Sequence, residues 1–148
     1  MTTKQLKTQL DWMCLNTWKQ ASYNTLWCLI GCSIGDLGTI YFFQVSEFDI
    51  PTVYVMALAI VNGILTSIVL ETFILLRQME FLIAFKTACG MSLISMISME
   101  LAMNIVDVLI TGGAEINVVA LPIMLLAGFC TPLPYNYWRL KALGKACH

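Results

Sequence analysis

Apolar stretches separated by short polar or charged segments constrain this chain more than any other feature. They cover residues 24–43, 53–76, 82–110 and 116–131. A helix needs about 20 apolar residues to cross a hydrocarbon core of roughly 30 Å. Apolar residues make up 59% of the chain and charged residues only 11%, so a water-soluble surface could not be covered with polar groups. The sequence therefore predicts a single-domain, all-α integral membrane protein in the form of a four-helix bundle.

The basic residues predict the orientation of these helices. All eight lie before the first apolar stretch, around the second connection or after the fourth stretch, whereas the first and third connections carry only acids. Lysine and arginine accumulate on the cytoplasmic side of a membrane. Both termini and the second connection are therefore expected in the cytoplasm, with the protein in the cytoplasmic (inner) membrane. The net charge of −1 gives no reason to expect a nucleic-acid partner.

The segments that flank the apolar stretches also have predicted structures. Residues 4–20 place apolar side chains near one helical face and most charges elsewhere, which is typical of an amphipathic helix at the membrane interface. Residues 132–148 contain two prolines and several aromatic residues, and they are expected to form a cytoplasmic tail anchored at the interface.

The first and third predicted helices each carry one polar face. With residues placed about 100° apart around a helix, one arc of the first helix gathers thiols, small residues and an acid. Its members are Asn24, Cys28, Gly31, Cys32, Gly35 and Asp36. The corresponding arc of the third helix holds Lys86, Cys89, Ser92, Met96, Met99, Glu100, Met103, Asn104 and Asp107. We expect these two faces to meet inside the bundle and the opposite, aliphatic faces to contact lipid.

The acids Asp36 and Glu100 lie near the centres of the predicted spans. A carboxylate at such depth costs at least about 2.5–3.5 kcal/mol unless it is protonated, paired or hydrated, and it is a functional candidate by default. A structural account also fits, in which the acids are protonated and hydrogen-bonded to Asn104, to Asn62 or to each other.

Another pair of charged residues has a simpler interpretation. Glu71 and Lys86 are nearly symmetric about the second connection, and we expect a structural ion pair between them.

The sulfur-containing residues indicate a candidate metal site. Cys28 and Cys32 are one helical turn apart, so their side chains could converge on one ion. Thioethers of the third helix share a face with the central acid; they belong to Met96, Met99 and Met103. Thiolates and thioethers select soft ions such as Cu(I). Cysteine and methionine also pack apolar interiors without any ligand, and Gly31 and Gly35 favour close helix packing at the same place.

The carboxyl-terminal residues Cys147 and His148 offer a second set of ligands. A thiol, an imidazole and a terminal carboxylate could capture a metal ion on the cytoplasmic side, or the tail could carry no ligand.

Several motifs together carry a family resemblance. They are Cys28-x-x-Gly31-Cys32-x-x-Gly35-Asp36, Ser92-x-x-Ser95-Met96 with Met99-Glu100-x-x-Met103-Asn104, Pro134-x-Asn136-x-Trp138 and Gly144-Lys145-x-x-His148. Over residues 21–148 the chain resembles a bacterial family of small membrane proteins, catalogued as domain of unknown function 4396. The resemblance marks Cys28, Cys32, Asp36, Glu100, Asn104 and His148. Some members are associated with copper-handling proteins. Members often have a histidine where this chain has Trp27.

These observations lead to two functional hypotheses. In the first, the protein binds or conducts a soft metal cation, with copper as the best match, and a homo-oligomer would complete the pathway. In the second, it is an accessory or assembly subunit that binds other membrane helices and transports no metal. An enzyme is not expected, because no pair of nucleophile and base is evident.

Overall fold

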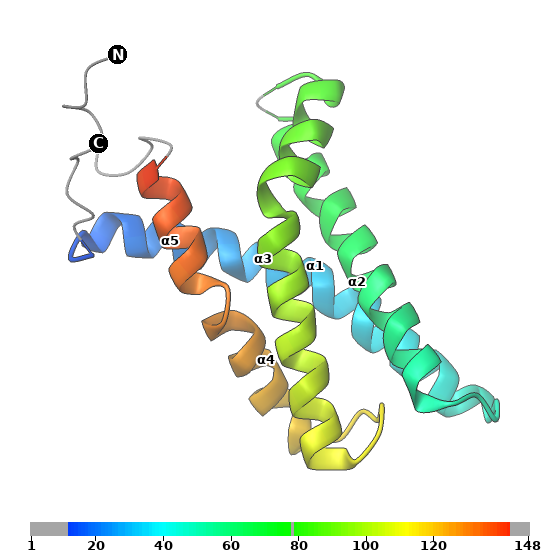
Figure 1. The fold of residues 1–148 in the computed structure, drawn as a ribbon. Coiled ribbons are helices and arrows are strands. Elements are labelled where there is room, and N and C mark those ends of the chain that lie inside the picture. The colour runs from blue at the N-terminus through cyan, green and yellow to red at the C-terminus, as the bar shows by residue number, and fades with distance from the viewer. Residues whose placement is uncertain (1–11, 78, 143–148) are drawn as a thin grey trace, which may run out of the picture.

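The computed structural model describes residues 12–77 and 79–142, and for Thr87, Met91 and Ser92 only the backbone. All regular structure in this part of the chain is helical, which confirms the all-α prediction. The helices are α1 (Leu15–Ser46), α2 (Thr52–Leu75), α3 (Phe81–Thr111), α4 (Ala120–Cys130) and α5 (Leu133–Ala142), and Figure 1 shows their arrangement.

The long helices α1, α2 and α3 form the frame of the molecule. Among the described residues, each contains a segment long and apolar enough to cross a membrane; in α3 this segment is Leu93–Thr111. Helix α2 packs along α1 and also contacts α3, while α4 packs on α3. The connections that follow α1 and α3 lie at one end of the molecule, and the turn between α2 and α3 lies at the other (Figure 1).

The start of α1 differs from the sequence prediction. Residues 15–20, expected in a separate interfacial helix, form the first turns of α1. The remainder of that predicted helix lies largely outside the described residues. Because α1 contains no proline, its backbone hydrogen bonding continues without a break into the apolar stretch. The helix ends where Glu47 adopts a left-handed conformation with φ of 51°.

The fourth apolar stretch also differs, because only Ala120–Cys130 is helical within the predicted residues 116–131. Eleven residues extend about 16 Å, well short of a hydrocarbon core. The side chain of Asn117 accepts a hydrogen bond from the N–H of Val119 (2.9 Å) just before the helix begins. Pro132 separates α4 from α5, which occupies part of the expected tail. The bundle thus consists of long helices and a bent pair of short ones.

Helix α5 packs against the first turns of α1. Tyr137 is fully buried, and its ring centroid lies 4.3 Å from that of Trp18. Nearby, the amide nitrogen of Asn136 donates a hydrogen bond to the hydroxyl of Thr25 (2.7 Å). The aromatic residues expected to anchor the tail at the interface therefore differ in role. Tyr137 is buried between two helices, whereas Trp138 is exposed.

Candidate functional site

The polar faces of α1 and α3 point into the protein, as the sequence predicts. Buried residues on α1 include Cys28, Gly31, Cys32, Gly35 and Asp36. Those on α3 include Met96, Met99, Glu100, Met103, Asn104 and Asp107. The exposed aliphatic residues on the opposite faces are Leu26, Ile30, Ile34, Ile94, Ile97, Leu101 and Ile105. Both helices therefore divide their surfaces between protein and the surrounding medium.

The sulfur-containing residues gather in one place. A single buried cluster contains Cys28, Cys32, Met96, Met99 and Met103, together with Leu29. The thiols of Cys28 and Cys32 lie close enough to each other to interact. Apolar residues of α2 and α4 pack around the cluster; they are Ile64, Ile68, Leu125 and Phe129. The structure thus unites the sulfur atoms of α1 and α3, which are distant in sequence, in an enclosed apolar environment.

Helix α2 completes this site through residues that the sequence analysis did not single out. The sulfur of Cys28 lies 3.5 Å from the hydroxyl oxygen of Ser67. That hydroxyl also donates to the backbone carbonyl of Cys28 (3.3 Å). The neighbouring hydroxyl of Thr66 donates to the carbonyl of Gly31 (2.7 Å), which lies about one turn beyond Cys28 on α1. Polar contacts from α2 therefore fix α1 at the level of its cysteines.

The predicted acids lie beside the sulfur cluster, and Asn104 connects them. Its amide nitrogen donates to Oδ1 of Asp36 (3.3 Å) and to the backbone carbonyl of Glu100 (2.9 Å). The Glu100 carboxyl group lies close to Cys32. Asp36 and Glu100 are both fully buried. One part of the structural account, the bond between Asp36 and Asn104, is present.

Four oxygen atoms of this group are buried without a hydrogen-bond partner: Asp36 Oδ2, Glu100 Oε1, Glu100 Oε2 and Asn104 Oδ1. Nearly all buried polar atoms in proteins have a partner. These four are all acceptors when the acids are ionised. What they require is therefore a donor or a positive charge, which a proton on a carboxyl group, a water molecule or a bound cation would supply.

Gly63 of α2 makes the position of Glu100 possible. A Cβ atom at residue 63 would collide with Glu100 Oε1, and it would lie 2.7 Å from Glu100 Cδ and 3.0 Å from the carbonyl oxygen of Cys32. The carboxyl group of α3 thus reaches the contact between α1 and α2. Gly63 stands with Ala59 and Ser67 at four-residue intervals, and all three are buried. This four-residue spacing of small residues is typical of close helix contacts in membranes. It is the sequence pattern from which the part played by α2 could have been predicted.

The glycines of α1 form the other side of this close contact. A Cβ atom at Gly31 would lie 2.7 Å from Cα of Ser67, and one at Gly35 would collide with the backbone of Asn62. The close packing expected at Gly31 and Gly35 is confirmed, with α2 as the partner helix.

Some candidate residues do not join the site. Lys86 is exposed, and the predicted ion pair between Glu71 and Lys86 stays a prediction. Ala84 and Ala88 are both fully buried, so helical periodicity turns the residue midway between them to the opposite face. Asn24 is also exposed, although it was expected on the inner face of α1.

Potential metal ligands outside the cluster are dispersed. Among the described residues, the free cysteines are Cys28, Cys32, Cys89 and Cys130, of which Cys130 is exposed and Cys89 only partly buried. No group of three or more histidine, cysteine, aspartate or glutamate side chains within residues 12–77 and 79–142 could hold a metal ion. A site for a soft metal ion in this region would therefore draw on further ligands, such as the methionine thioethers of the sulfur cluster. Cys147 and His148 lie outside the described residues.

Residues 17–145 match the family described as "Domain of unknown function (DUF4396)". No curated protein and no solved structure matches the chain.

Proposed function

Since the chain belongs to the DUF4396 family, whose description states no activity, we propose a function from its own residues. The protein binds or conducts a soft metal cation, with Cu(I) as the best fit. The observation that carries this proposal is the buried cluster of Cys28, Cys32, Met96, Met99 and Met103.

The chemistry of the cluster favours a soft monovalent ion. Cu(I) can bridge two thiolates one turn apart, with the thiol protons released to solvent as the ion binds, and the thioethers of α3 supply neutral soft ligands. Because Met96, Met99 and Met103 are fully buried, they would displace the hydration shell of an entering ion. Harder ions such as Mg²⁺ and Ca²⁺ prefer sets of oxygen ligands, which this cluster does not offer.

The acids would compensate the charge of the ion. Glu100 and Asp36 lie beside the sulfur cluster, and three of their four carboxyl oxygens have no hydrogen-bond partner. A cation bound among the sulfur atoms would interact favourably with an ionised carboxylate in this apolar environment. In this proposal Asp36 and Glu100 attract the ion, Cys28 and Cys32 bind it, and the methionines complete its coordination.

The proposal includes a membrane topology. The protein lies in a cytoplasmic membrane with both termini in the cytoplasm, and α4 together with the first turns of α5 makes the fourth crossing. Arg139 and Lys141, in the last turn of α5, then lie at the cytoplasmic surface. Cys147 and His148, which follow in sequence, would receive the ion there.

Copper retention by purified protein tests the proposal. Detergent-solubilised wild-type protein is loaded with Cu(I) under reducing conditions and passed over a competing Cu(I) chelator, and the remaining metal is quantified by elemental analysis. We expect wild type to retain copper and the Cys28→Ser/Cys32→Ser variant to lose it. The matched control is Cys89→Ser/Cys130→Ser, which removes two free thiols outside the cluster and is expected to retain copper.

Two outcomes would contradict this proposal. Wild type could fail to retain copper, or both double variants could retain it equally. If a copper-free protein instead copurifies with a fixed membrane partner in the presence of a chelator, the role of an accessory subunit is favoured.

A further inference from the structure

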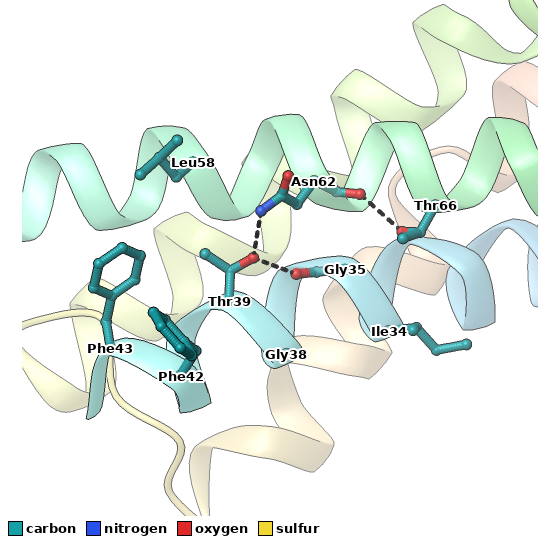
Figure 2. A pocket seen from close by; sticks show the side chains of 9 residues that line it. All are labelled: Ile34, Gly35, Gly38, Thr39, Phe42, Phe43, Leu58, Asn62 and Thr66. Carbon is teal, nitrogen blue, oxygen red and sulfur yellow. Dashed lines mark hydrogen bonds between the residues drawn. The ribbon is translucent and has the colours of Figure 1, made fainter. Parts of the chain in front are cut away.

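A groove between α1 and α2 opens on the outer surface of the molecule and contains a polar side chain. It has a volume of about 440 Å³ and is lined mainly by apolar and small residues, among them Ile34, Phe42 and Leu58. Figure 2 shows Asn62 and Thr39 in the middle of this lining. The sulfur cluster lies elsewhere, on the inner face of α1. The groove therefore needs its own explanation.

Asn62 is a polar amide at the centre of a membrane-spanning helix, yet it is exposed. Its amide nitrogen donates to the hydroxyl of Thr39 (2.8 Å), which itself donates to the carbonyl of Gly35 (2.7 Å). Within the described part of the chain, the amide oxygen accepts no hydrogen bond, and the second N–H of the amide is also available. Acyl chains offer no hydrogen-bonding group, so an amide at this depth requires a partner from protein.

Gly38 opens the same groove to close approach. A Cβ atom at Gly38 would meet nothing within 4 Å, whereas one at Gly31 or Gly35 would contact α2. Gly38 therefore serves no packing contact in this part of the chain. A glycine on the outer face of a membrane helix lets a second helix approach the backbone closely.

We propose that the groove is the interface with a second copy of this chain, in which the two Asn62 side chains pair across a twofold axis. A carboxamide has both a donor and an acceptor, so two identical amides can form reciprocal hydrogen bonds. A twofold interface places the same residue on both sides of its axis, which this pairing requires. The axis runs parallel to the membrane normal, because both copies are inserted in the same orientation.

The dimer proposal goes beyond the cation site and does not depend on it. Asn62 and Gly38 line the groove and are exposed, whereas Cys28, Cys32 and the methionines belong to a buried cluster within one copy. Loss of copper retention would leave the dimer prediction intact, and a monomeric protein would leave the copper experiment intact.

Energy transfer between labelled copies tests the interface. Donor- and acceptor-labelled proteins are reconstituted together into phosphatidylcholine vesicles, and association is measured over a range of protein-to-lipid ratios. We expect wild type to dimerise and Asn62→Leu to weaken association by about 3- to 20-fold, the range typical of interhelical hydrogen bonds in membranes. Gly38→Leu, which fills the groove with a bulky side chain, is expected to reduce association as well.

The matched control is Gly90→Leu. Gly90 is an exposed helical glycine on α3, and a Cβ atom there also meets nothing within 4 Å. This variant should dimerise as wild type does. Circular dichroism checks that each variant keeps its helical content, and Gly38→Leu keeps the test decisive if Asn62→Leu does not fold. A monomeric wild type would overturn the proposal, whether the groove then holds lipid or a different protein. Equal association of all three variants would overturn it too.

Discussion

The position of the Glu100 carboxyl group depends on one residue of α2, Gly63. The side chain leaves α3 and ends where α1 and α2 are closest, at Gly63. Among the described residues its carboxyl oxygens have no hydrogen-bond partner within bonding geometry, and the group lies close to Cys32 and Asp36. Because neither oxygen has a hydrogen-bond partner in the described part of the chain, the state of this acid depends on whether a proton or a cation is close.

Replacing Gly63 with alanine is expected to destabilise the protein by about 1–3 kcal/mol, the usual effect of adding a methyl group to a well-packed interior. The new methyl group would collide with the Glu100 carboxyl group. Thermal unfolding in detergent measures the effect. Gly90→Ala is the control, because its methyl group meets nothing within 4 Å and alanine favours helix by up to about 1 kcal/mol. A Gly63→Ala protein as stable as wild type would show that Glu100 is not confined by this glycine.

The helices differ in how far sequence could predict their roles. The buried faces of α1 and α3 could be predicted because their polar residues recur with helical periodicity. Helix α2 could not be treated in the same way, since its polar residues Asn62, Thr66 and Ser67 do not form one stripe. Its inner face is instead marked by small residues such as Ala59 and Gly63, which side-chain polarity does not reveal.

The ends of α4 could not be predicted from hydrophobicity either. Residues 116–119 are apolar apart from Asn117, yet they are not α-helical. The side chain of Asn117 bonds to the backbone N–H of Val119, and such local bonds compete with helix formation. Pro132 then limits the helix at its other end. Apolar length alone predicts a span, whereas these two residues determine how much of it is helical.

At the level of elements, we expect α5 to be held mainly by Tyr137. Tyr137→Ala should lower the free energy of unfolding by about 3–5 kcal/mol, because it empties the space of a fully buried aromatic ring. Trp138→Ala is the control, since Trp138 is 45% exposed. Thermal unfolding and limited proteolysis of α5 provide the measurements. Equal effects of the two substitutions would show that burial of Tyr137 does not hold α5 in place.

For the whole molecule, the arrangement of the connections agrees with the distribution of charge. The connections after α1 and α3 lie at one end of the molecule, and the turn between α2 and α3 lies at the other (Figure 1). The first two connections named carry only acids, whereas the turn contains Arg77. Lysine and arginine remain on the cytoplasmic side when helices insert. The long helices could therefore be located and ordered from the sequence, and their orientation in a membrane stays a prediction. The bent pair of α4 and α5 was not foreseen.

This orientation can be measured with single cysteines and a membrane-impermeant maleimide on intact cells. Cysteines placed at Glu47 and Glu115 are expected to react from outside, whereas a cysteine at Arg77 should react only after permeabilisation. Wild type provides the baseline for the native thiols, of which Cys130 is exposed. The reverse pattern of labelling would contradict the proposed orientation.

The contact between α5 and α1 also bears on biosynthesis. Asn136 and Thr25 are 111 positions apart in the chain, so the ribosome releases α1 well before its partner exists. During that interval the Thr25 hydroxyl already has a hydrogen-bond acceptor, because it donates to the carbonyl of Ala21 in its own helix (2.7 Å). The amide nitrogen of Asn136 later donates a second hydrogen bond to the same Thr25 hydroxyl oxygen. The Thr25 hydroxyl of the first helix therefore has a hydrogen-bond acceptor before α5 is synthesised, and the contact between α1 and α5 forms only afterwards.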